Sequence, residues 1–205
     1  MPVKLHWSPR SPFVRKVMIA AHELGVADRL QTVRTVVAMI KPNLELLPEN
    51  PLGKIPTLVL DDGTPVYDSL TICEYLDSLA GPRLFPAAGP ARWTALTWHA
   101  LGNGLLDTLI LWRNERDKPL QQQTPEWLAG FALKTTSSLN RLQAMAPALE
   151  AAPFGIGHIA IGCALSYLDF RFADQGWRQA RDALSAWHRM FEGRPSVQAT
   201  EVVDA

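Results

Sequence analysis

The sequence predicts a small α/β domain followed by an all-helical domain. Three observations lead to this fold class. Extended and helical patterns alternate over the first 80 residues, a segment rich in proline and glycine follows at residues 81–90, and strand patterns are missing beyond it. We therefore expect one domain at residues 1–80 and a second at residues 91–205, joined by a linker at residues 81–90.

The first domain is predicted to have the element order βαβ, then α, then ββα. The helix at residues 12–25 has apolar residues at helical spacing and ends at Gly25. A helix at residues 68–81 is capped by Asp68 or Ser69 and ends at Gly81. The strands are expected at residues 3–7, 30–37, 57–60 and 65–67, the last two forming a hairpin.

The second domain is predicted to consist of helices packed on one another. Six of the seven tryptophans lie in this half, as expected where large apolar faces meet. The helices are expected at residues 91–118, 125–149, 157–174 and 178–193.

The composition excludes several classes of protein. Lysine plus arginine equals aspartate plus glutamate at 20 each, and a neutral chain lacks the basic surface that nucleic acid requires. There is no apolar run of membrane-spanning length and no signal-peptide core, so we expect a soluble, cytoplasmic protein. Only Cys73 and Cys163 are present, both in apolar helical patterns. We therefore expect buried thiols, with neither a disulfide framework nor a metal site.

Three stretches contain residues that could bind a ligand. In ENPLGKIPTLVL (49–60), Pro56 stands just before a strand, where a cis bond would expose the backbone of Ile55 to a peptide-like ligand; a trans bond in a plain turn is the alternative. In VYDSLTICEYL (66–76), Asp68 and Ser69 begin a helix, where backbone N–H groups attract anions, although both could simply be capping residues.

The third stretch is SPRSPFVRKV (8–17). Ser11 stands at the start of a helix with Pro12 at the first helical position, so its hydroxyl could donate to an anion there. Ser8 lies closer to the strand, and we expect it to bond its own backbone.

Taken together, SPFVRKV, NPLGKIPTLVLDDG and DSLTICEYL resemble the cytosolic glutathione transferase superfamily over the whole chain, and in particular its bacterial serine-type members near the theta and zeta classes. The resemblance implies a thioredoxin-like N-terminal domain and an all-α C-terminal domain. It also implies glutathione as co-substrate, a small electrophile as second substrate and a homodimer. Relatives with cysteine at the Ser11 position catalyse disulfide exchange. Because this residue is a serine here, we do not expect that activity.

The resemblance assigns a role to several residues. Ser11 would contact the glutathione sulfur and stabilise its thiolate, so that glutathione is the nucleophile. Ile55, through cis-Pro56, would pair with the cysteinyl part, and Asp68 with Ser69 would hold the γ-glutamyl end. The glycine carboxylate would be reached by Lys41 and Lys54. The candidate walls of the second-substrate pocket, expected between the domains, are Trp7, Arg10, Leu109, Trp112 and Arg113.

One departure from the family concerns the central helix of the second domain. Many members begin it with a Ser/Thr-x-x-Asp capping box, whereas here Gly155 is expected as the cap with His158 in the aspartate position. Asp169 further along is expected to be structural.

The sequence also bears on functions other than transfer to glutathione. A Ser-His-Asp hydrolase is disfavoured because the G-x-S-x-G elbow is missing and the five histidines are scattered; only His99, with Trp98, is considered for the cleft. A non-catalytic glutathione-binding or interaction module stays open, because fold does not fix function. A glutathione-dependent peroxidase would use the same thiolate.

Overall fold

The computed structural model describes residues 3–204, which form two compact units. The first contains residues up to Arg92 together with the segment from Pro195 onward, and the second spans Trp93–Arg194. A thioredoxin-like unit and a helical unit are thus both present, as predicted. The predicted range 91–205 differs from the structure at its end, because the C-terminal segment groups with the first unit.

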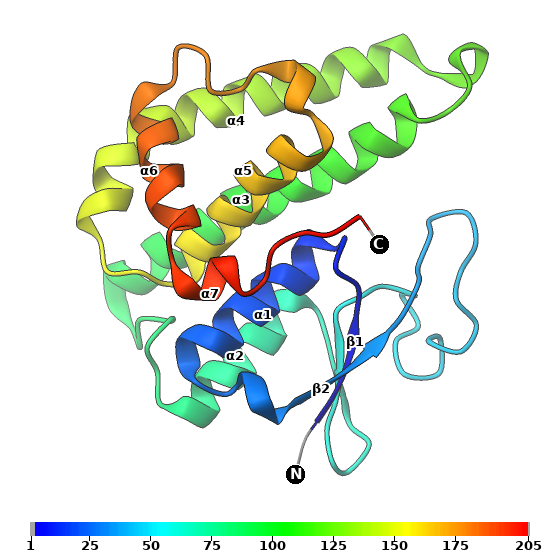
Figure 1. Ribbon diagram of the computed structural model, residues 1–205, viewed down its shortest axis with the longest axis vertical. Coiled ribbons are helices and arrows are strands. Elements are labelled where there is room, and N and C mark those ends of the chain that lie inside the picture. Colours follow the sequence, from blue (N-terminus) through cyan, green and yellow to red (C-terminus); the bar gives the residue numbers. More distant parts are fainter. Residues whose placement is uncertain (1–2, 205) are drawn as a thin grey trace. The chain divides into compact units, whose positions relative to one another are not determined.

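A four-stranded mixed sheet organises the first unit, with the strand order β2-β1-β3-β4. Figure 1 labels two of these strands, β1 and β2. The strands are β1 (Val3–Trp7), β2 (Leu30–Arg34), β3 (Thr57–Val59) and β4 (Pro65–Val66). β1 is parallel to β2 and antiparallel to β3, which is antiparallel to β4. Leu5 and Leu58 are fully buried, so the two central strands carry the core of this unit.

Helices α1 (Pro12–Leu24) and α2 (Ser69–Ala80) pack against each other, and α2 contacts β3. The buried face of α1 includes Val14, Val17 and Leu24, as its apolar spacing predicts. Gly25 ends α1 in the left-handed conformation, with its N–H bonded back to the helix.

The second unit is built around a buried helix. Residues 156–168 of α5 (Ile156–Arg171) are all buried. A Cβ atom at Gly102 would lie 2.5 Å from the carbonyl carbon of Ala160, so only glycine allows this approach of α3 to α5. The other helices are α3 (Gly89–Arg116), α4 (Pro125–Ala151) and α6 (Asp182–Glu192). Short 3-10 turns stand at Ala27–Arg29, Leu120–Gln122 and Ala173–Gln175.

Some predicted elements differ from those observed. The helix expected between the second and third strands is not formed, because Pro42, Pro48 and Pro51 fall in that segment, which folds as consecutive turns. β2 ends at Arg34, and α6 begins at Asp182 after turns at residues 177–180. A short helix α7 (Pro195–Gln198) was not predicted. Within residues 3–204, no helix is long and apolar enough to cross a membrane.

Candidate functional site

The sheet register brings the three predicted stretches to one edge. His6 pairs with Thr57 in antiparallel fashion, so the end of β1 lies beside the start of β3. Leu58 pairs with Val66, so the end of β4 lies there as well. The chain therefore leaves this edge towards Ser11, enters it from Ile55–Pro56, and leaves it again towards Asp68.

Ser11 is the N-cap of α1, with Pro12 in the first turn as predicted. Its Oγ accepts the N–H of Val14 at 3.3 Å. A hydroxyl has one proton and two acceptor positions, so this bond leaves the proton to donate to a ligand. Ser8 Oγ instead accepts the N–H of Arg10 at 3.4 Å, which confirms that it bonds its own backbone.

The Ile55–Pro56 peptide bond is cis, so the trans alternative is wrong. Ile55 forms an apolar cluster with Val14 and Leu46, which connects the start of β3 to α1.

The turn before Ile55 is held by a residue that sequence reasoning missed. Asn50 is 1% exposed, and its Nδ2 donates to the carbonyl of Lys54 at 3.0 Å and to Thr57 Oγ1 at 2.9 Å. Thr57 Oγ1 donates to the same carbonyl at 2.9 Å. The available signal was an asparagine directly before Pro51, a pair typical of turns.

Asp68 is the N-cap of α2, and Ser69 is its first residue. Asp68 Oδ1 accepts the N–H groups of Leu70 at 3.0 Å and Thr71 at 3.5 Å. Asp68 is exposed whereas Ser69 is 2% exposed, so the carboxylate faces outward while the serine side chain lies inside. The capping interpretation of Asp68 is therefore confirmed, and an additional role in binding stays a prediction.

The remaining predicted residues are distributed over both units. Lys41 and Lys54 are exposed in the first unit, on the segment between β2 and β3. Trp7 packs beside the Ile55 cluster, and Arg10 is exposed next to Ser11.

In the helical unit, Leu109 has no exposed surface. The Trp112 ring lies 4.9 Å from that of Phe172, and Arg113 donates to the Tyr167 hydroxyl at 3.2 Å. Leu109 and Trp112 are thus buried, and the role of all five residues as pocket walls stays a prediction.

Known proteins of similar sequence and structure identify the family of this chain. The model of the family described as "Glutathione S-transferase, N-terminal domain" matches residues 10–79. A glutathione transferase family member from Pseudomonas fluorescens Pf-5, solved with bound glutathione, is 40% identical with a TM-score of 0.95, covering 98% of this chain and 99% of that chain. The chain belongs to the glutathione transferase superfamily.

Two further relatives extend the family comparison. A structure of a Pseudomonas fluorescens Pf-5 family member with bound S-(propanoic acid)-glutathione is 39% identical, has a TM-score of 0.90 and covers 98% of this chain and 100% of that chain. The uncharacterized GST-like protein YibF of Escherichia coli K12 is 29% identical over 204 residues, which are 97% of this chain and 98% of that protein.

A polar network that joins β1 to the segment after β2 was not predicted from the sequence. Glu49 forms ion pairs with Lys4 and with His6, the latter at 2.5 Å from Nε2 to Oε2. His6 Nδ1 lies 2.8 Å from Thr35 Oγ1. These contacts fix the segment between β2 and β3 onto β1. Burial raises the pKa of Glu49, but the hydrogen bonds and charges of Lys4 and His6 outweigh it and hold the pKa below its usual value.

We expect Glu49→Gln to lower the free energy of unfolding by about 1 kcal/mol at pH 7, because it removes charge-assisted bonds from a partly exposed carboxylate. A depressed folded-state pKa gives stability that is present above the unfolded pKa and lost as pH falls through the folded pKa. The variant should therefore lose less stability on acidification below about pH 4.5 than the parent. Urea unfolding at several pH values measures this, with Glu45→Gln, an exposed glutamate of the same segment, as control. Parallel pH curves for parent and Glu49→Gln would contradict the expectation.

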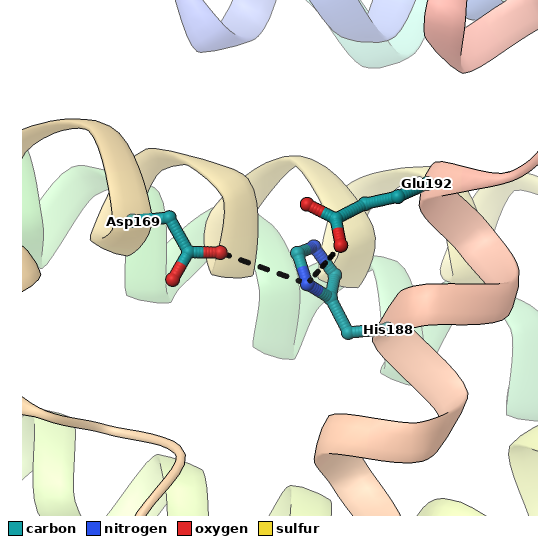
Figure 2. Close-up of side chains that lie close together, drawn as sticks. All are labelled: Asp169, His188 and Glu192. Atoms are coloured by element: carbon teal, nitrogen blue, oxygen red, sulfur yellow. Dashed lines mark ion pairs between the residues drawn. The ribbon is translucent and has the colours of Figure 1, made fainter.

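A second polar cluster lies in the helical unit and resembles a Ser-His-Asp chain. Ser166 Oγ is 3.1 Å from His188 Nε2. His188 Nδ1 is 3.7 Å from Asp169 Oδ2 (Figure 2). The Arg178 guanidinium, which can only donate, is 3.1 Å from Nδ1. Nδ1 is therefore the acceptor, and Nε2 carries the proton and donates to Ser166. A general base would need Nε2 without a proton, facing the serine hydroxyl. The Ser166, His188 and Asp169 side chains therefore do not form a hydrolytic triad.

The same cluster offers donor atoms of the kind that bind zinc. Nδ1 of His188 and one carboxylate oxygen each from Asp169 and Glu192 lie within 4.8 Å of one another (Figure 2). Arg178 already places its positive charge there, 2.5 Å from Asp169 Oδ2 and 3.8 Å from Glu192 Oε2. The Trp177 indole N–H also donates to Asp169, at 2.7 Å. The cluster ties α5 to α6, in agreement with the expected structural role of Asp169.

Proposed function

We propose that the protein is a glutathione S-transferase that binds glutathione in its thioredoxin-like unit and activates the thiol for attack on a small, hydrophobic electrophile. The observation that carries this proposal is the Ser11 hydroxyl, which caps α1 as an acceptor and keeps its proton for a thiolate. The relatives that bind glutathione support it. Within the family, we propose the serine-type theta- or zeta-like subtype, a cytoplasmic location and a role in detoxification.

The energies of these interactions are large enough to lower the pKa of the glutathione thiol without a general base. Lowering a thiol pKa from about 8.5 to about 6.5 requires about 2.7 kcal/mol. A hydrogen bond to a charged group contributes about 1.5–3 kcal/mol, and a helix N-terminus adds about 0.3–1 kcal/mol. Ser11 and the N-terminus of α1 together would supply this amount.

The other contacts of glutathione in this proposal follow the sheet edge. The backbone of Ile55, beside cis-Pro56, would pair with the cysteinyl part. Asp68 would balance the γ-glutamyl ammonium group while Ser69 N–H holds its carboxylate at the start of α2. Lys54, with Lys41, would attract the glycine carboxylate, and Asn50 would support this arrangement by fixing the Lys54 carbonyl.

A homodimer is also part of the proposal. An open groove of about 630 Å³ lies between α3 and α4 and is lined partly by Leu101 and Leu133, the latter 72% exposed. Exposed apolar side chains of this kind are a surface that a second subunit could cover.

Calorimetric titration with reduced glutathione tests the binding site, using Asp68→Asn as the main variant. Asparagine keeps an oxygen to accept the N–H groups of Leu70 and Thr71, so α2 stays capped while the negative charge is lost. We expect glutathione to bind the variant about tenfold more weakly, because its ammonium group loses an ionic partner.

Asp62→Asn is the matched control. Asp62 is also exposed and accepts a backbone N–H, from Thr64, but it lies in the turn between β3 and β4, away from the predicted site. Saturable binding that Asp68→Asn and Asp62→Asn weaken equally would contradict the assigned position. No binding to the parent protein would favour an interaction module on the same fold.

A further inference from the structure

The C-terminal segment is attached along α1. Ser196 Oγ donates to Glu23 Oε1 at 2.5 Å, near the end of α1, and the Arg15 guanidinium donates to the Val197 carbonyl at 3.3 Å. From α7 the chain continues without regular structure to residue 204 (Figure 1). Because these contacts proceed from Glu23 towards Arg15, the segment runs back along α1 towards its N-terminus.

At its end, this segment places a carboxylate beside the Arg10 guanidinium. Asp204 Oδ1 lies 3.1 Å from Nε of Arg10, the residue that directly precedes the N-cap. Both side chains are about half exposed, 50% for Arg10 and 56% for Asp204. Exposed pairs of this kind are weak, so a carboxylate from solution could take the place of Asp204.

The surroundings of Arg10 favour a negatively charged group. The N-terminus of α1 has positive polarity, and the planar guanidinium offers five N–H donors that match a carboxylate. A molecule whose reactive carbon lies at the glutathione sulfur, near Ser11, would place a neighbouring carboxylate within reach of the adjacent residue.

We propose that Arg10 recognises a carboxylate on the electrophilic co-substrate, and that Asp204 occupies the same guanidinium when no such substrate is bound. This inference rests on the proposed glutathione transferase function and names its substrate class, small electrophilic carboxylic acids. Arg10 is thus a specificity-determining residue, and Asp204 a competitor supplied by the chain itself.

Two synthetic conjugates that differ in one group test the inference: S-(2-carboxyethyl)glutathione and its amide, S-(2-carbamoylethyl)glutathione. The measured quantity is the ratio of their dissociation constants, obtained by calorimetry. We expect the parent to prefer the acid by about tenfold, since a charge-assisted bond is lost in the amide. In Arg10→Gln the ratio should approach one. In Asp204→Asn the preference should increase about two- to threefold, as expected on removing a weak competing ion pair.

Arg29→Gln is the matched control, because Arg29 is an exposed arginine of the same unit at the opposite end of α1. The ratio of the two dissociation constants in this variant should equal that of the parent. An acid preference that Arg10→Gln leaves unchanged would overturn the inference. So would a result in which Arg10→Gln weakens both conjugates equally, because Arg10 would then bind glutathione itself. Titration of the parent with glutathione alone separates the two proposals: without saturable binding, the transferase function itself is wrong.

Discussion

Replacing Ser11 with aspartate is expected to give a folded protein that has lost most of its turnover. Aspartate can accept the Val14 N–H and cap α1, but as a carboxylate it has no proton to donate to a thiolate. In Ser11→Ala the cap is lost as well. Without the hydroxyl, the pKa of the bound thiol should rise from about 6.5 to about 8, and kcat/KM at neutral pH should fall about 10- to 100-fold.

The ultraviolet absorbance of the thiolate, titrated with pH in the glutathione complex, measures this pKa directly. Ser11→Ala should recover activity at alkaline pH, where the thiol ionises without help, whereas the added negative charge should keep Ser11→Asp slower. Ser8→Ala is the control, since Ser8 bonds to the Arg10 backbone. A thiol pKa in Ser11→Ala equal to that of the parent would refute the role of Ser11 and leave it as a helix cap.

The elements that the sequence predicts well are those with a local physical cause. Pro12 in the first turn and Gly25 after the last locate α1 within one residue, and the apolar spacing between them identifies its buried face. The sequence indicates Asp68 as a cap because the capping bonds extend only two or three residues along the chain. The three stretches that are predicted to bind a ligand are likewise each short and contiguous in the sequence.

The features that the sequence did not predict depend on distant pairs. Glu49 contacts His6 and Lys4 across more than 40 residues, and no periodicity indicates such pairs. The return of the C-terminal segment along α1 depends on a hydrogen bond from Ser196 to Glu23, which lies 173 residues earlier. α7 has only four residues, which is too short for a helical pattern to register. The ion pair between Arg10 and Asp204 depends on the same return, because its two residues lie near opposite ends of the sequence.

His158 stands at the position where many family members have the aspartate of a capping box. The structure shows how the histidine replaces it. Its Nδ1 accepts the N–H of Gly155 at 3.1 Å, and its Nε2 lies 3.0 Å from the Leu149 carbonyl, to which it donates. Gly155 has no side chain, so only this half of a capping box exists, and the imidazole must supply it. His158 is 5% exposed; burial lowers its pKa, and the charge of Arg194 lowers it further.

We expect His158→Ala to lower the free energy of unfolding by about 2–4 kcal/mol, because it leaves a buried N–H and a buried carbonyl without partners. His158→Asn, whose oxygen can accept the Gly155 N–H, should recover part of this loss. Urea unfolding followed by tryptophan fluorescence is the measurement, since six of the seven tryptophans lie in the helical unit. His22→Ala, at an exposed histidine, should stay close to the parent.

The pH dependence separates the loss of this buried histidine from a general packing defect. Because the folded-state pKa of His158 is depressed, the unfolded chain binds a proton that the folded chain does not as pH falls below about 6.5. The parent should therefore lose stability between pH 7.5 and the folded pKa, and neither His158 variant should show this part of the loss. The stability gap between parent and variants should narrow on acidification. A gap that stays constant with pH would mean that His158 is not held neutral, and that its contribution comes from packing against Trp98 and Phe154.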